Sequence, residues 1–114
     1  MEIQYNDLEH VIGVIKLIGI LYTQGVGAIE TKFAGYSTGD HAKVLVDLTF
    51  VEFLTSIGIR LLVTTAKSVA NRGGKMIIFN PNENVKGVLD MTGIMDIIPI
   101  HMDFEAAIAD LSAK

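Results

Sequence analysis

The stretch VLVDLTFVEFLTSIGIRLLV, residues 44–63, sets the order of elements in the fold. Its first three residues form a continuous apolar run, which is typical of a strand buried on both faces of a sheet, and Asp47 is expected to end that strand. After Ser56, apolar residues recur every three or four positions, which indicates a helix. Residues 48–54 between them are interpreted as a loop. Because this loop is largely apolar, we expect it to lie over the core or under a partner.

Short apolar runs alternate with helical patterns on both sides of this stretch. Strands are expected at residues 3–5, 11–17, 76–79 and 97–100, with a turn at Asn6-Asp7 and Gly19 ending the second strand. Helices are expected from Thr23 to about Gly35, from the cap Asn82 to Gly93, and from the cap Asp103 onward with Phe104, Ile108 and Leu111 facing inward. This order predicts an α/β fold with a mixed, mostly parallel sheet of about five strands and about four helices. The first two strands should form an antiparallel edge pair.

Composition narrows the class of protein. The chain has 114 residues, half of them hydrophobic, which favours one domain spanning residues 1–114 with a substantial core. Only 19% of residues are charged, which favours buried β-structure or a sizeable partner surface. The net charge is −4 and no run of Lys or Arg occurs, which argues against nucleic acid as a direct partner. The apolar windows are too short for membrane insertion, and the acidic start does not resemble a signal peptide, so we expect a cytoplasmic protein.

No side-chain pattern indicates catalysis. Cysteine is absent, and His10, His41 and His101 lie far apart in the sequence, so no metal site is expected. Acidic residues are spread singly and form no acid/base pair. The segment NRGGKM lacks the glycine and hydroxyl spacing of a phosphate-binding loop and is interpreted as a helix end with a turn. We therefore predict that the chain is not an enzyme and binds no cofactor.

The hydroxyl pair Thr55-Ser56 stands where the helix pattern begins. A hydroxyl there can cap the helix by accepting a hydrogen bond from a free backbone N–H, and we expect Ser56 to be this cap. A phosphate on the same hydroxyl would add about −1.5 to −2 charge, which the positive end of the helix dipole tolerates. Inside an apolar docking surface, that charge would repel a partner. An apolar rim around a helix-start hydroxyl is therefore suited to a phosphorylation switch.

The stretches VLVDLTFVEFLTSIGIRLLV, GGKMIIFNPNENVKGVLDMTGI and FEAAI resemble the anti-sigma-factor antagonists of the STAS domain family. The motifs run in the family's order and spacing over roughly residues 11–111. They are Asp47-Leu48-Thr49, Val51, Phe53, Ser56, Gly58, Gly73-Gly74, Asn80-Pro81, Val88-Leu89 and Thr92-Gly93. The resemblance implies a mixed sheet covered by helices. It also implies partner switching, in which the unphosphorylated chain binds an anti-sigma factor, often a serine-protein kinase, and frees a sigma factor.

The resemblance assigns a role to the hydroxyl pair. It implies that Ser56 is the phosphoacceptor, with Thr55 in reserve. The partner should then dock on the segment around it, for which we name Phe50, Phe53, Leu54, Thr55, Ser56, Ile57 and Arg60.

The chain departs from the family pattern at two positions. The Asp that precedes the family's serine is Thr55 here, and its second serine is Ile57. Such departures also fit STAS domains that are not phosphorylated. The alternatives are a STAS subunit of a bacterial phospholipid ABC transporter and a STAS scaffold protein. In each case the chain could also form a homodimer.

Overall fold

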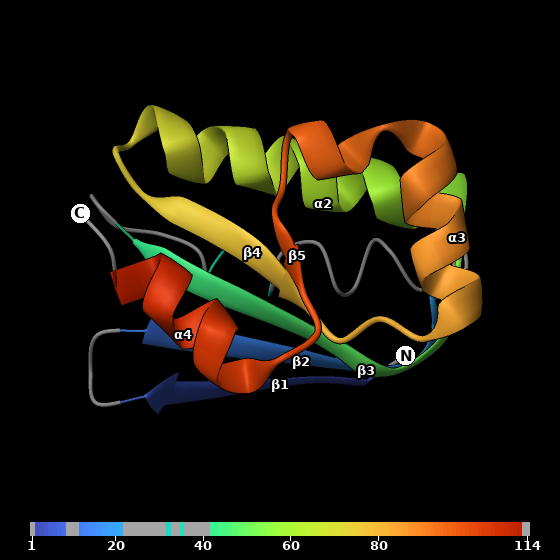
Figure 1. The fold of residues 1–114 in the computed structure, drawn as a ribbon, viewed down its shortest axis with the longest axis horizontal. Helices are drawn as coiled ribbons and strands as arrows, with labels where there is room; N and C mark the ends of the chain where they lie inside the picture. Colours follow the sequence, from blue (N-terminus) through green and yellow to red (C-terminus); the bar gives the residue numbers. More distant parts are fainter. Residues whose placement is uncertain (1, 9–11, 22–31, 33–34, 36–41, 113–114) are drawn as a thin grey trace.

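A five-stranded mixed sheet forms the centre of the computed structural model, which describes residues 2–8, 12–21, 32, 35 and 42–112 (Figure 1). The spatial order β1-β2-β3-β4-β5 follows the chain order, and β1 is antiparallel to β2 while the other neighbours are parallel. The mostly parallel sheet and its antiparallel edge pair are thus confirmed. The strands are β1 Glu2–Leu8, β2 Ile12–Leu21, β3 Lys43–Leu54, β4 Lys75–Phe79 and β5 Ile100–His101.

Strand β3 lies at the centre of the sheet and is buried on both faces where the sequence predicted it. Val44 and Val46 pack into one hydrophobic cluster, and Leu45 between them packs into another. Side chains alternate between the two faces of a strand, so a continuous apolar run supplies both clusters at once.

Helices cover the two faces of the sheet unequally. Helices α2 (Ser56–Asn71) and α3 (Glu83–Thr92) share a core cluster with β2, β3 and β4, while α4 (Phe104–Ser112) packs on the opposite face (Figure 1). The 3₁₀ helix η1 (Ile94–Asp96) follows α3. The helix expected from Thr23 to Gly35 lies outside the described residues except for Lys32 and Gly35, both of which are helical and exposed.

The apolar segment 48–54 is not a loop, because β3 continues through it to Leu54. The pairing with β2 shifts twice, once between Lys16 and Ile18 and once between Gly19 and Ile20, and each time β3 carries one extra residue. Such β-bulges break the strict alternation of inward and outward residues, which is why the segment lacked a strand pattern in the sequence. The expectation that Asp47 ends the strand was wrong for the same reason.

Other boundaries also differ from expectation. Strand β1 includes Asn6 and Asp7, where a turn was expected, because both pair with residues of β2. Strand β2 continues past Gly19, whose φ of 104° accommodates the second bulge. The final strand contains only Ile100 and His101, because η1 and the turn after it occupy the preceding residues.

The predicted helix ends are largely confirmed. Asn82 caps α3 by accepting from the amide of Val85 at 2.8 Å, and Gly93 ends that helix with a left-handed φ of 71°. Asp103 caps the last helix by accepting from the amide of Ala106 at 3.1 Å. Phe104, expected to face inward, is 43% exposed, and its ring contacts Phe79 edge-on with the ring centroids 5.6 Å apart.

Candidate functional site

The turn from β3 into α2 presents the hydroxyl pair. Thr55 has an extended backbone, with φ −87° and ψ 167°, and its Oγ1 accepts from the amide of Gly58 at 3.3 Å. Thr55 is therefore the N-cap, and Ser56 is the first residue of the helix. The prediction that Ser56 caps α2 was wrong, because a cap needs a non-helical backbone and only the folded chain shows which of two adjacent hydroxyl residues has it.

Ser56 is exposed in the first turn of α2. That turn contains no acidic residue, so nothing within it offsets the positive end of the helix dipole. The exposed Arg60 stands one turn further along, at the i+4 spacing at which side chains on a helix surface are neighbours. The start of α2 is therefore electrostatically suited to an anionic group on Ser56.

The apolar residues named for partner binding divide into two groups. Phe50 and Phe53 are 53% and 51% exposed. Leu54 is only 3% exposed, and Ile57 is partly buried against the core formed with α2 and α3. The two aromatic residues are thus exposed, while the two aliphatic ones belong to the interior.

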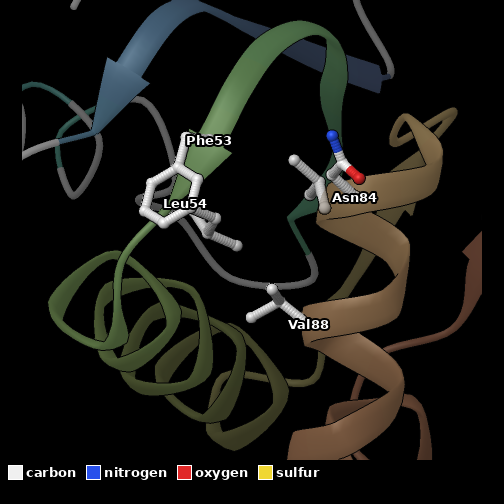
Figure 2. A pocket seen from close by; sticks show the side chains of 5 residues that line it. Phe53, Leu54, Asn84 and Val88 are labelled. Carbon is white, nitrogen blue, oxygen red and sulfur yellow. The ribbon is translucent and has the colours of Figure 1, made fainter.

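A cleft of about 280 Å³ opens between the end of β3 and α3 (Figure 2). Phe53 and Leu54 line its strand side, and Asn84, Val85 and Val88 line its helix side. Its volume is just below the ~300–1,000 Å³ of typical small-molecule sites. No sequence signal could place that helix beside Phe53.

Phe50 belongs to a different part of the surface. Lys16 of β2 lies over its ring, with Nζ 4.3 Å from the ring centroid, which is the geometry of a cation–π contact. Lys16 follows Val14 by two residues and therefore shares its face, and Val14 packs with the α4 cluster. Phe50 thus lies on the α4 face of the sheet, whereas Phe53 borders the cleft beside α3.

A cluster of ionisable side chains lies where α4 meets the sheet. Asp110 bonds to Lys75 Nζ through one carboxylate oxygen and lies 2.7 Å from His101 Nε2 through the other. The hydrogen bond from Lys75, with a further one from His101, lowers the pKa of Asp110. Across the described ranges, no three metal-ligating side chains are grouped to hold an ion, and no helix is long and apolar enough to span a membrane. His10 and His41 lie outside those ranges.

The fold is that of a STAS domain. The model of the STAS domain family matches residues 3–107, and the chain belongs to that family. It is 24% identical over 100 residues to the anti-sigma-B factor antagonist of Listeria monocytogenes, covering 88% of this chain and 86% of that one.

Solved structures show the same fold. An anti-sigma-factor antagonist (STAS) domain protein from Planctomyces limnophilus superposes with a TM-score of 0.87 and 25% identity, covering 96% of this chain and 97% of that one. The anti-sigma factor antagonist SpoIIAA in its unphosphorylated form gives a TM-score of 0.77 at 19% identity over 99% of both chains. SpoIIAA has also been solved in a phosphorylated form.

Proposed function

We propose that this chain is an anti-sigma factor antagonist. It is a binding protein of the cytoplasm rather than an enzyme, and it sequesters an anti-sigma factor and so frees a sigma factor. The exposed Phe53, the cleft beside it and the exposed start of α2 together form the docking surface. The names of the relatives support the class of partner, and the exposed Phe53 beside the cleft supplies an apolar surface on which a protein can dock.

We further propose that phosphorylation of Ser56 by a serine-kinase anti-sigma factor ends the complex. One observation carries this proposal: Ser56 is exposed at the first helical position while Thr55 makes the cap. A phosphate on Ser56 leaves the capping bond intact, so the fold persists while the docking surface becomes negative. A phosphate on Thr55, the reserve acceptor, would instead alter the oxygen that accepts from Gly58.

The test begins with capture of partners from native cells on the unmodified chain. Ser56→Ala and Ser56→Asp are then compared for affinity to the captured partner and for thermal stability. Ser56→Ala should bind as tightly as the parent. Ser56→Asp should fold normally but bind at least tenfold more weakly, because its carboxylate must lose its hydration at the interface. A tenfold loss of affinity corresponds to about 1.4 kcal/mol of binding free energy.

Ser112→Asp supplies the matched control, since it makes the same chemical change at an exposed position on α4 and should leave binding unchanged. A Ser56→Asp variant that binds as tightly as the parent would refute the switch. Capture of an ABC transporter ATPase in place of an anti-sigma factor would refute the proposed partner class and favour the transporter-subunit alternative.

A further inference from the structure

Strand β3 extends beyond the end of its neighbour β4. Its pairing with β4 ends where Asp47 faces Phe79, yet β3 continues to Leu54 with pairing to β2 on the other side. The backbone groups of residues 48–54 that would have met β4 need other partners, because unpaired backbone groups are costly away from water. Asn82, in the segment Asn80-Pro81-Asn82 that follows β4, supplies one such partner.

Two asparagine side chains reach from this segment to β3. Asn80 Nδ2 donates to Thr49 Oγ1 at 3.2 Å, and Thr49 in turn donates to Asp47 Oδ1 through its hydroxyl and its amide. Asn80 has a left-handed φ of 54°, a conformation that asparagine adopts more readily than most residues. Asn82 Nδ2 donates to the carbonyl of Val51 at 3.0 Å.

Asn82 performs two tasks with one amide group. Its Oδ1 accepts from the amide of Val85 and so caps α3, while its Nδ2 holds the Val51 carbonyl. The first bond fixes the start of the helix that carries Val85 and Val88. The second fixes the strand two residues before Phe53. These are the two sides of the cleft (Figure 2).

We propose that Asn82 is a positioning residue for partner recognition, which sets the separation of the two sides of the cleft by tying the start of α3 to the end of β3. This inference rests on the proposed function, because it concerns the same docking surface. It predicts that partner affinity depends on the amide N–H of Asn82 itself, separately from the helix cap.

Three substitutions distinguish the hydrogen bond from Asn82 to the Val51 carbonyl, called the tie below, from the cap of α3. Asn82→Asp keeps an oxygen that can accept from Val85 but has no donor for the Val51 carbonyl. Asn82→Ser also keeps an accepting oxygen without adding charge, and its shorter side chain lacks the amide N–H that reaches the Val51 carbonyl. Asn82→Ala loses both interactions. If Asn82 is only a cap, Asp and Ser should behave like the parent, because all three residue types are good N-caps.

Hydrogen exchange on the isolated chain tests the tie without any partner. In Asn82→Asp and Asn82→Ser, the end of β3, residues 50–54, should exchange about two- to tenfold faster, as expected for loss of one hydrogen bond. The amide of Val85 should stay protected in both variants and lose protection in Asn82→Ala. Parental exchange at residues 50–54 in both the Asp and Ser variants would overturn the inference.

Binding to the captured anti-sigma factor tests the consequence. Asn82→Ser should weaken affinity about tenfold or less, and its effect should be non-additive with that of Val88→Ala, because both act through the cleft. Asp103→Ala, which removes the cap of α4 on the opposite face, controls for lost stability and should bind normally. Additive effects of Asn82→Ser and Val88→Ala would refute the positioning role. Failure of the parent chain to bind an anti-sigma factor would refute the proposed function, while the exchange result would still report on the tie.

Discussion

At the scale of single residues, two adjacent hydroxyls have different tasks. Thr55 lies outside the helix and caps it, while Ser56 lies inside the helix and is exposed. Substitution of these two chemically similar side chains should therefore affect stability differently. The capping oxygen contributes to stability, whereas the exposed hydroxyl is accessible to modification at little structural cost.

Thr55→Ala should therefore lower the free energy of unfolding by about 0.5–2 kcal/mol, because the amide of Gly58 loses its acceptor. Ser56→Ala should change it by less than about 0.5 kcal/mol, as is usual for surface substitutions. Urea unfolding of both variants measures the difference. Thr55→Ser, which retains a capping hydroxyl, should keep most of the parent's free energy of unfolding. Equal destabilisation by the two alanine variants would contradict the assignment of the cap.

At the scale of elements, α4 is held on its face of the sheet by a small apolar cluster and by one carboxylate. Ala107 and Leu111 are the buried residues that α4 contributes. Asp110 joins the helix to Lys75 at the start of β4 and to His101 in β5. Because the side chain of Lys75 is 43% exposed, solvent screens its ion pair with Asp110 and limits the stabilisation that it gives.

Asp110→Asn should lower the free energy of unfolding by about 0.5–1 kcal/mol at pH 7. The pKa of Asp110 is lowered in the folded chain, so its contribution is fully present above the unfolded value of about 3.9 and disappears as the pH falls through the folded value. The gap between parent and variant should thus close below about pH 4. Urea titrations from pH 7 to pH 3 measure it. Asp90→Asn, at an exposed position on α3, serves as the matched control. A gap that is as large at pH 3 as at pH 7 would contradict this account.

At the scale of the whole molecule, β3 joins two cores of different size. The cluster under α2 and α3 contains most of the buried side chains, and the cluster under α4 is much smaller. Leu45 is completely buried and is the residue of β3 in the smaller cluster. Among the described residues, the face of the sheet that carries α4 therefore buries few side chains.

Leu45→Ala should lower the free energy of unfolding by about 2–5 kcal/mol, because a cavity replaces a fully buried side chain between β3 and α4. Met91→Ala should change it by less than about 0.5 kcal/mol, because Met91 is 88% exposed. Denaturant unfolding of the two variants measures both free energies and tests the predicted difference. A Leu45→Ala variant as stable as Met91→Ala would show that the smaller cluster contributes little.

Local chemistry in the sequence determined much of the architecture. The buried triplet at the start of β3, the cap Asn82, the left-handed Gly93 and the cap Asp103 could all be predicted, because each depends on a residue's own conformational preference or on its nearest neighbours in the chain. The order of strands and helices followed from these signals. The hydroxyl pair could likewise be located as a candidate site.

Tertiary structure decided what depends on pairing between distant segments. The two bulges that extend β3 to Leu54 exist only in its register with β2, so the sequence suggested a loop there. The choice of Thr55 over Ser56 as cap depends on where the helical backbone begins. The cleft brings Phe53 together with Val88, and the tie joins Asn82 to Val51, across separations that no periodic pattern encodes. The sequence determined the elements because their signals are local, whereas the site needed the fold because its two sides meet only after β3 and α3 have packed.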